Sequence, residues 1–213
     1  SYVGQPYTVT WEFSSSPAAG SMVTVSDGTN SCTAPASDGS CTLASTSAGA
    51  KTLTATYSGD GSTAAESHQV NKRDTGVEIA GPSDPLCACQ PALLTATVVD
   101  ITGATGSPAF SGTITWSTTG AGTFDSNTCT VSAGGQCSVY YTPSPDDVGT
   151  IQITASYSGD GSYEPSSHTF SLSVTQRATH TEVSCDPATV YVKETTTITV
   201  KVTDLASNCC GTC

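Results

Sequence analysis

The chain has 213 residues, a net charge of −12 and only six Lys and Arg residues, which lie scattered along the sequence. Scattered cations cannot neutralise a phosphate backbone or an anionic bilayer, so the composition argues against nucleic-acid and membrane-surface partners. The many Thr, Ser, Val and Gly residues favour strands and predict an all-β fold. We find neither an apolar run that could span a bilayer nor a basic-then-apolar leader, so we expect a mature or internal segment without membrane insertion.

Ten cysteines are many for a chain of this size, and disulfides persist mainly in oxidising compartments. Two pairs, Cys32 with Cys41 and Cys129 with Cys137, each bracket a glycine-containing turn. We expect each pair to form a disulfide across a hairpin, against the alternative of buried free thiols. The chain is therefore expected to be extracellular, on the cell surface or secreted.

The first unit, residues 1–74, opens with an alternating stretch at 7–13 that predicts a strand. Further strands are expected at 22–26, 40–44, 51–57 and 67–71. Its Trp11 lies in TVTW, which matches TITW around Trp116, and a lone Trp on a strand is usually a core anchor. We therefore expect Trp11 and Trp116 to be equivalent core residues, with the first unit lacking the first two strands of the fold.

A hairpin motif recurs at a spacing of one hundred residues (157 − 57), as ATYSGDGS around Tyr57 and ASYSGDGS around Tyr157. Each copy predicts a strand, a tight Gly-Asp-Gly turn and a returning strand. A period this long marks a whole domain, and both tyrosines are expected in the core. His68 and His168 follow in matching text, which favours a structural role on the returning strand.

The second unit, residues 75–177, adds strands at 76–79 and 92–100 before the Trp116 strand. Short strands around Cys129 and at 137–141 follow, and the hairpin closes the unit. Seven short alternating strands at roughly ten-residue spacing are typical of an immunoglobulin-like sandwich. The Cys…Trp…Cys spacing of antibody domains is absent, so we expect no disulfide between the sheets.

Two linkers, 71–75 and 176–180, flank the second unit, and a third unit begins at 178. Strands are predicted at 181–184 and 195–204, and the second of them copies 95–100 with a shift of 104 (204 − 100). The remaining residues to 213 contain Cys209, Cys210 and Cys213. The third unit, 178–213, thus supplies the first two strands of a further module.

This pattern resembles tandem bacterial Ig-like repeat domains of surface and adhesin-like proteins. The likeness is carried by the VVD and VTD strand ends, TVTW and TITW, the two YSGDGS hairpins and the S-H-x-V/F strand, and it covers nearly the whole chain. It implies β-sandwich modules that serve as spacers, binders or fibres. The hairpin cysteines and the terminal cysteine cluster are not part of the family pattern.

An orphan strand pair exposes an apolar face and unpaired backbone groups. We therefore expect the third unit to be completed either by further modules of the same chain or by copies of itself joined head to tail through strand donation. Both alternatives predict an extended fibre or stalk.

Six more cysteines are expected to meet at one module junction: Cys87, Cys89, Cys185, Cys209, Cys210 and Cys213. We predict at least one disulfide between the Cys87/Cys89 turn and the other four. The alternative is a metal or Fe–S site, but the spacing is not that of a zinc ribbon.

Four aspartates near strand ends and Gly-Asp-Gly turns are weak calcium candidates: Asp60, Asp100, Asp160 and Asp204. Such turns favour Asp for backbone reasons alone, and the EF-hand spacing is absent. His180 lies in a linker. No G-x-S-x-G motif supports a nucleophile, so we expect no enzyme, no cofactor and no resident metal.

The sequence favours a structural role, in an extracellular filament or cell-surface stalk of Ig-like modules stiffened by disulfides. The alternative is an adhesin-type module that binds carbohydrate or a host protein, with Tyr140, Tyr141 and Tyr163 as candidate contacts. A third possibility is an accessory domain of a secreted polysaccharide hydrolase.

Overall fold

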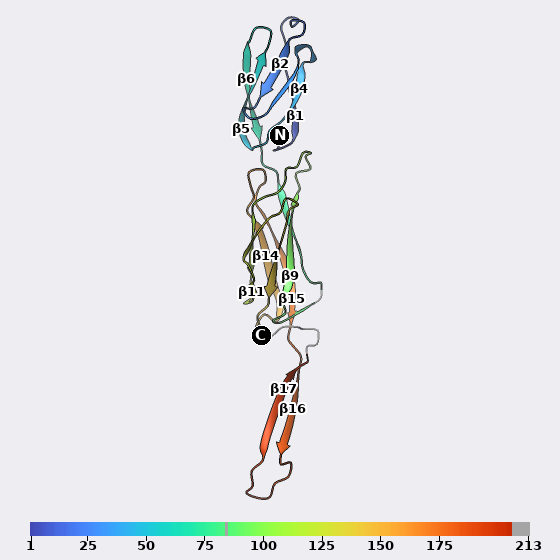
Figure 1. The fold of residues 1–213 in the computed structure, drawn as a ribbon, viewed down its shortest axis with the longest axis vertical. Coiled ribbons are helices and arrows are strands. Elements are labelled where there is room, and N and C mark those ends of the chain that lie inside the picture. Colours follow the sequence, from blue (N-terminus) through green and yellow to red (C-terminus); the bar gives the residue numbers. More distant parts are fainter. Residues whose placement is uncertain (84, 206–213) are drawn as a thin grey trace.

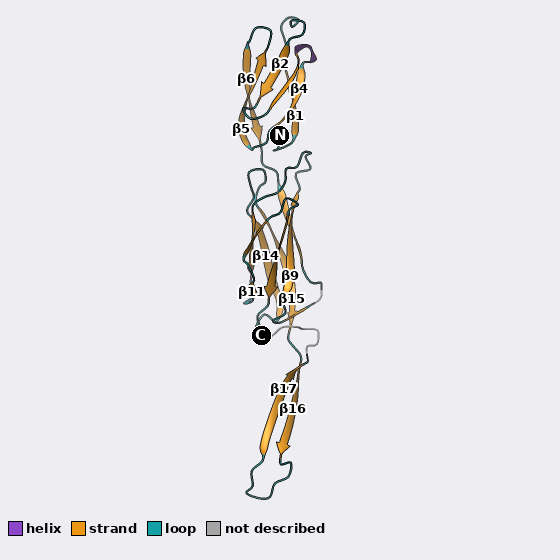
Figure 2. Ribbon diagram, viewed as in Figure 1, coloured by secondary structure: helices purple, strands orange, loops and turns teal. Residues whose placement is uncertain are grey.

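The computed structural model describes residues 1–83 and 85–205. Three units follow one another along a single long axis, so the molecule is a rod (Figure 1). The ordered elements are almost all strands, apart from the short 3-10 turn η1 at Ala36–Asp38 (Figure 2). The rod therefore owes its length to the end-to-end stacking of β-modules.

The first module is a small sandwich of two sheets. Strands β1 and β4 form one sheet, and the other has the order β3-β2-β5-β6. Buried Val23, Val25, Leu43 and Leu53 fill the space between the sheets, with Trp11 packed at the edge of this cluster. The strands are β1 (Pro6–Thr10), β2 (Met22–Ser26), β3 (Ser31–Pro35), β4 (Ser40–Ala44), β5 (Gly49–Tyr57) and β6 (Thr63–Val70).

The second module is a larger sandwich with sheets of order β11-β13-β9-β7 and β12-β10-β14-β15-β8. Pairing of β9 with β13 in one sheet, and of β10, β14 and β15 in the other, is the arrangement of an immunoglobulin-like fold. The strands are β7 (Thr75–Ala80), β8 (Leu86–Cys87), β9 (Ala92–Asp100), β10 (Thr113–Thr118), β11 (Thr123–Phe124), β12 (Thr128–Thr130), β13 (Gln136–Thr142), β14 (Gly149–Tyr157) and β15 (Ser166–Thr175).

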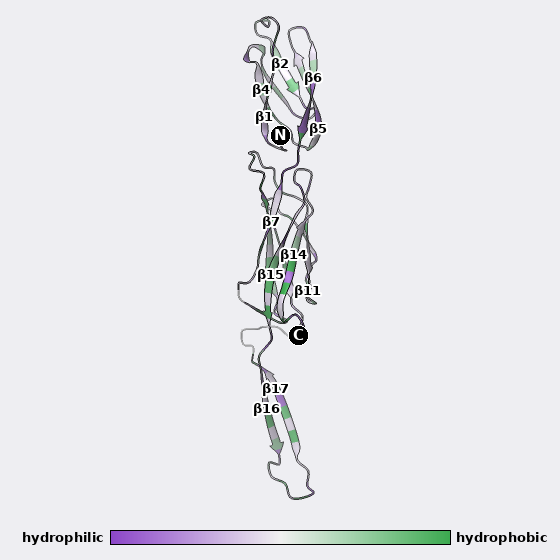
Figure 3. Ribbon diagram, turned by 180° about the vertical axis from the view of Figure 1, so that it is seen from behind, coloured by the Kyte–Doolittle hydropathy of each residue, from purple (hydrophilic) through white to green (hydrophobic). Residues whose placement is uncertain are grey.

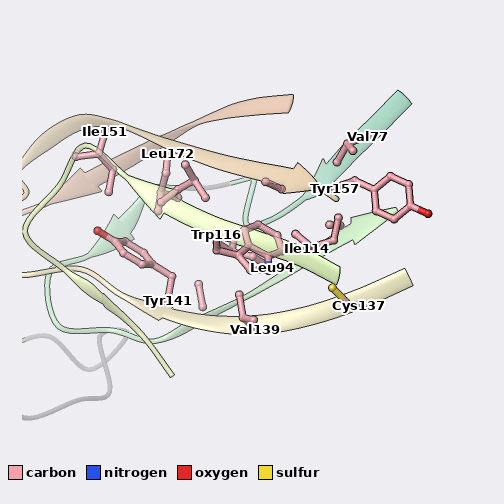
Figure 4. Close-up of a cluster of buried hydrophobic side chains, with 14 of the residues drawn as sticks. Val77, Leu94, Ile114, Trp116, Cys137, Val139, Tyr141, Ile151, Tyr157 and Leu172 are labelled. Atoms are coloured by element: carbon pink, nitrogen blue, oxygen red, sulfur yellow. The ribbon is translucent and has the colours of Figure 1, made fainter. Parts of the chain in front are cut away.

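The core of the second module follows from strand alternation. On β9, Leu94, Ala96 and Val98 point inward and are buried, while the residues between them face out. They meet Trp116 on β10 and Tyr157 on β14, both buried in the same cluster (Figure 4). Both residues were predicted core positions.

The third unit is the two-stranded hairpin of β16 (Thr179–Asp186) and β17 (Thr197–Asp204), which extends away from the second module (Figure 1). Thr179 pairs with Asp204 as Thr75 pairs with Asp100, so its register is that of β7 and β9 shifted by 104 residues (204 − 100). Every described position of both strands is exposed. The face that corresponds to the buried side of β7 and β9 is therefore open. Hydrophobic segments occur along both strands of the hairpin (Figure 3).

Trp11 is not the counterpart of Trp116, which corrects the sequence-based equivalence. Trp11 N donates to Gly39 O beside the β1–β4 pair, just as Val98 N donates to Gly135 O beside the β9–β13 pair. Strand β1 therefore takes the place of β9. In the pairing with the next strand of the sheet, Val25 on β2 lies opposite Ala55 as Trp116 on β10 lies opposite Ala155. The first module thus differs from the expectation of two missing strands, because it contains a counterpart of β9 and has an open edge where β7 would pair.

His68 and His168 are also not equivalent. Gly49 pairs with Val70 and Gly149 with Val174, so the connection is four residues longer in the second module (25 against 21 residues of separation). The matching text around the two histidines is therefore displaced by four positions along the returning strand.

The two hairpin disulfides cross between the sheets, against the sequence-based expectation. Cys32 bonds to Cys41 with sulfur atoms 2.02 Å apart, and Cys129 to Cys137 at 2.03 Å. In each module the first cysteine lies on an edge strand of one sheet and the second on a strand of the other sheet. The segment between them therefore passes from sheet to sheet and is not a hairpin turn within one sheet.

Candidate functional site

The linker between the first two modules carries a cation, Arg73, that is completely buried. One guanidinium nitrogen donates to Val3 O of the first module at 2.9 Å and to Thr105 O of the second at 3.3 Å. The other donates to Ala104 O and to Ser107 Oγ. A single side chain therefore ties a turn of the first module to a loop of the second.

Asp100, at the end of β9, supplies the charge partner of this arginine. Arg73 Nε lies 2.5 Å from Asp100 Oδ2, and the carboxylate also accepts from Ser107 Oγ and Thr102 N. Burial of the carboxyl raises its pKa, but the hydrogen bonds from Ser107, Thr102 and Arg73 outweigh burial and lower the pKa to about 2. The Asp100 carboxylate is thus ionised throughout the physiological pH range.

The backbone of Arg73 is held as well as its side chain. Its N–H donates to Ser162 O at 2.8 Å, and its carbonyl accepts from Glu164 N at 2.9 Å. Ser162 and Glu164 belong to the connection that is four residues longer than its counterpart in the first module. The added residues therefore serve to hold the linker.

Two glycines bring the modules into backbone contact. A Cβ atom built on Gly4 would lie 2.2 Å from Gly106 O, and one built on Gly106 would lie 2.1 Å from Gly4 O. Any side chain at either position would force the two backbones apart. With Arg73 and Asp100, this contact defines what we call the junction clamp.

The second linker repeats the charged part of the clamp. Arg177 Nε donates to Asp204 Oδ2 at 2.7 Å, 104 residues after Arg73 and Asp100 (177 − 73). The backbone pairing is repeated too, since Leu205 N donates to Ala178 O as Ile101 N donates to Asp74 O. The hairpin module therefore joins the second module through the same local structure.

The turn on which the clamp docks is also present twice. Tyr2 forms a parallel bridge with Asn71 in the first module, and Cys87 pairs in parallel with Thr175 in the second. Asn71 and Thr175 are themselves 104 residues apart (175 − 71). The turn at residues 2–5 thus corresponds to the turn at 87–90.

Further details of the two turns agree. Gly4 has φ 75° and Cys89 has φ 65°, so both occupy the left-handed region that side chains rarely adopt. A glutamine follows each, and its Oε1 accepts the backbone N–H at the start of the turn. Cys89 therefore occupies the position in its turn that Gly4 occupies in the first.

The structure divides the six cysteines that were expected to meet. Cys87 and Cys89 are both disulfide-bonded. Cys185 is a free, exposed thiol, and the prediction that it joins the junction is wrong because β16 carries it six residues, roughly 20 Å, away from the linker. Cys209, Cys210 and Cys213 lie outside the described residues, so a bond from the Cys87/Cys89 turn to them stays a prediction.

The three candidate contact tyrosines separate into two kinds. Tyr141 and Tyr163 are fully buried, and their hydroxyls donate to Asp147 Oδ2 and Pro108 O. Tyr140 is 50% exposed and pairs across the strands with Leu93, which is 49% exposed. Of these three tyrosines, Tyr140 alone presents a half-exposed ring to a partner, and it does so together with Leu93.

The four aspartates of the weak calcium hypothesis are engaged by the chain itself. Asp100 and Asp204 each hold an arginine, which supplies the positive charge at those carboxylates. Asp160 accepts from Ser111 Oγ and Tyr163 N, and exposed Asp60 accepts from Ser62 N. Over residues 1–83 and 85–205, no three metal-ligating side chains gather into a possible site.

The first module has an open groove between the free edge of β1 and strand β6. It measures about 530 Å³ and exposes Tyr7, Val9 and Trp11 on one side and His68 on the other. The rings of Tyr7 and His68 stack with centroids 4.3 Å apart. In the second module β7 fills this place, so the groove is shaped for a strand.

Within the described part of the chain, no helix is long and apolar enough to cross a membrane. No protein-family model and no curated protein matches the sequence. Invasin, described as a bacterial integrin-binding protein, matches with a TM-score of 0.49 and 18% identity over 85% of this chain and 40% of its own.

Two further solved structures match with lower TM-scores. The D0–D1 domain of intimin matches with a TM-score of 0.33 and 18% identity, over 79% of this chain and 89% of its own. A β-glycosidase from Bacteroides vulgatus matches with a TM-score of 0.38 and 13% identity, over 72% of this chain and 21% of its own. At these low scores and identities, no inference about function rests on the matches.

Proposed function

We propose that this chain is a segment of an extracellular rod, in which immunoglobulin-like modules are locked end to end to form a cell-surface stalk or filament without catalysis. The observation that carries the proposal is the buried guanidinium of Arg73, which donates to backbone carbonyls of both modules. A flexible tether needs no such contact, whereas a spacer that must hold its length does. The disulfides within each module support an oxidising, extracellular setting for the rod.

Small-angle X-ray scattering on the whole chain tests the rod. We expect a maximum dimension that matches the extended molecule and that shortens on average when Arg73 is replaced by Ala. Equal scattering curves for the wild type and Arg73→Ala, both with the signature of freely jointed modules, would contradict the proposal.

Head-to-tail assembly is the more specific form of this proposal. The place of β7 is open in the first module, and β16 copies the register of β7. In such an assembly β16 exchanges its pairing with β17 for the free edge of β1 in a second copy, as in strand addition to a sheet edge. The same hairpin would serve equally to start a further module of a longer chain.

An adhesin-type binding role is the second candidate, and the Tyr140–Leu93 pair favours it. Half-exposed aromatic and aliphatic side chains that face each other across two strands offer apolar contact to a carbohydrate ring or a host protein. Binding to a panel of immobilised glycans and to host cells, measured for the wild type and Tyr140→Ser, tests this role. Retention that depends on Tyr140 supports it, and no retention at micromolar protein counts against it.

A further inference from the structure

The first two modules differ at the pole that lies away from the C-terminal hairpin, which is the upper end of each module in Figure 1. In the second module this pole is closed by Arg73 and by the rings of Phe110 and Tyr163, whose centroids are 4.4 Å apart. Tyr163 is fully buried, and its hydroxyl donates to Pro108 O. The loop after β9 supplies Phe110, and the connection between β14 and β15 supplies Tyr163.

Both of these connections are four residues shorter in the first module. Strand β1 takes the place of β9, so Phe13 is the counterpart of Asp100, and Val23 is the counterpart of Ile114 in the pairing of the next strand. Phe13 and Val23 are 10 positions apart, against 14 for Asp100 and Ile114 (23 − 13 and 114 − 100). The hairpin connection is shorter by the same number. Within residues 1–74 the two closing rings therefore have no counterpart, and an aromatic residue stands where the clamp has its carboxylate.

Three aromatic rings and one carboxylate line the cavity at the open pole, which measures about 160 Å³. The rings belong to Trp11, Phe13 and Tyr57, and the carboxylate belongs to Glu12. Phe13 is 37% exposed, and the centroid of its ring lies 4.9 Å from that of Tyr57. The Tyr57 hydroxyl accepts a hydrogen bond from Ala18 N at 2.9 Å, which holds the ring in place. The cavity is therefore both accessible and ordered.

The charges around this cavity favour a cation. Glu12 is exposed, and Glu66 lines the open groove that adjoins the cavity and shares Trp11 with it. None of the described residues that line these two spaces is a lysine or an arginine. The face of an aromatic ring carries negative potential and attracts cations, and the net charge of −12 adds a long-range attraction of the same sign.

We propose that this cavity binds a quaternary ammonium group, such as the trimethylammonium head of choline. Methyl groups replace the N–H donors of such a cation, so it gives up few hydrogen bonds when it leaves water for a cavity of rings. An ammonium ion is strongly hydrated, and apart from Glu12, Ser62 and Thr63 the lining is aromatic or aliphatic. The inference goes beyond the proposed stalk, because it adds a ligand-binding site to the first module.

The site adjoins the edge of β1 that accepts a strand in the proposed head-to-tail assembly. A strand that pairs there as β7 pairs with β9 would reach Phe13, because Thr75 pairs with Asp100. Cation binding is therefore expected in the unassembled chain. The titrations below belong at protein concentrations at which the chain sediments as a monomer.

Titration of the whole chain with choline chloride, followed by the indole N–H signals in NMR spectra, tests the site. We expect the Trp11 signal to shift and to saturate with a dissociation constant in the millimolar range, while the signal of buried Trp116 stays in place. Ammonium chloride at equal ionic strength, and the neutral alcohol in which carbon replaces the choline nitrogen, should give no saturating shift. An equal shift with either control, or a choline shift that never saturates, overturns the proposal.

Three variants give a second test. Glu12→Gln removes the charge and Phe13→Leu removes a ring, and each is expected to weaken choline binding about fivefold. Tyr140→Leu is the matched control, because it removes a half-exposed ring from the outer face of the second module and should bind choline as the wild type does. Unchanged binding in Glu12→Gln, whose side chain is exposed and not needed for folding, overturns the proposal, as does an equal loss in all three variants. Scattering tests the rod and titration tests the cavity, so the two can fail separately.

Discussion

Arg73 and Asp100 form an ion pair that closes a loop of 27 residues, and the arginine donates to the first module from the same position. The pair stands between a linker and the end of β9, so it is at once part of the second module and part of the junction. Burial of a cation is costly unless its donors are satisfied, and here backbone carbonyls of both modules satisfy them. The orientation of the modules is thereby coupled to the fold of the second one.

Replacing Arg73 by Ala is expected to destabilise the second module and to loosen the junction. Removing one partner of a buried ion pair typically costs about 3–5 kcal/mol, because the remaining charge loses its compensation. Urea denaturation followed by tryptophan fluorescence, to which Trp116 of the second module contributes, measures the free energy of unfolding. Arg73→Lys should recover only part of the loss, since an ammonium group cannot reproduce the planar fork of donors.

Lys72→Ala is the matched control for this substitution. It removes the same charge from the adjacent position, where the side chain only lines a shallow polar depression at the junction. We expect a change of less than about 0.5 kcal/mol for this variant. A loss as large as that of Arg73→Ala would mean that net charge and not the clamp stabilises the junction.

Acid should open the clamp within a defined pH window. The pKa of Asp100 is about 2 in the folded chain, below the ordinary value of about 3.9 that applies when unfolded. A lowered folded pKa contributes stability that is present above about pH 4 and is lost as the pH falls toward 2. The difference in unfolding free energy between the wild type and Asp100→Asn should therefore shrink from pH 5 to pH 2.

The difference between the two proteins is the informative quantity. The pKa values of Asp147 and Asp160 are also lowered, against the upward effect of burial, by backbone hydrogen bonds and, for Asp160, by one from the Ser111 hydroxyl. Both proteins will therefore lose stability in acid, whether or not the clamp titrates. A difference that stays constant down to pH 2 would show that Asp100 does not contribute through its charge.

The repeated hairpins, the alternation of β9 and the pairing of the third unit's strands are all readable in the sequence, because each depends on local pattern. The predicted equivalence of Trp11 and Trp116 is wrong. TVTW and TITW look alike in the sequence, but the place of a strand in the fold depends on the strands with which it pairs. The sequence holds a better signal, because Gln5-Pro6 matches Gln90-Pro91 and Ser16-Pro17 matches Ser107-Pro108. These matches align residues 7–11 with the beginning of β9.

Arg73 could not be recognised as the central residue of the junction from the linker alone. Its partners come from residue 3, from the loop at 104–107 and from the long hairpin connection, so its burial is a property of the folded chain. The one sequence signal is the spacing of 27 between Arg73 and Asp100, which recurs between Arg177 and Asp204 (100 − 73 and 204 − 177). The glycine-containing turns within the Cys32–Cys41 and Cys129–Cys137 segments predict hairpins in the sequence, but in the structure the chain passes from one sheet to the other there.

The disulfides that cross between the sheets are expected to stabilise each module. A loop of about nine residues closed by a disulfide corresponds to roughly 2.6 kcal/mol of lost entropy in the unfolded chain. Cys129→Ser with Cys137→Ser should lower the unfolding free energy of the second module by about this amount, as measured by chemical denaturation. Cys185→Ser, which removes an exposed free thiol, should leave stability unchanged, and an equal loss there would contradict the assignment.

The open face of the β16–β17 hairpin should drive self-association of the chain. Its side chains include Val183, Ile198, Val200 and Val202, each 60–64% exposed. Val200→Thr with Val202→Thr replaces two methyl groups by hydroxyls and should weaken association about tenfold, at about 0.8 kcal/mol for each methyl lost from the apolar contact. Sedimentation velocity over a range of concentrations measures the effect.

Substitutions on the opposite face provide the control for association. Thr199→Ser with Thr203→Ser removes two methyl groups from alternate positions of β17 that face the other way. We expect association equal to that of the wild type. If both double variants weaken association alike, the apolar face is not the contact surface.

The distance between the first two modules in solution tests the rigid junction most directly. Spin labels at Ser67 on β6 and Thr169 on β15, in a Cys185→Ser background, place one probe on each module, and pulsed electron–electron resonance reports the distribution of distances between them. A single narrow distribution that broadens in Arg73→Ala is the predicted result. A broad distribution with Arg73 intact would contradict a clamp that holds the modules in line.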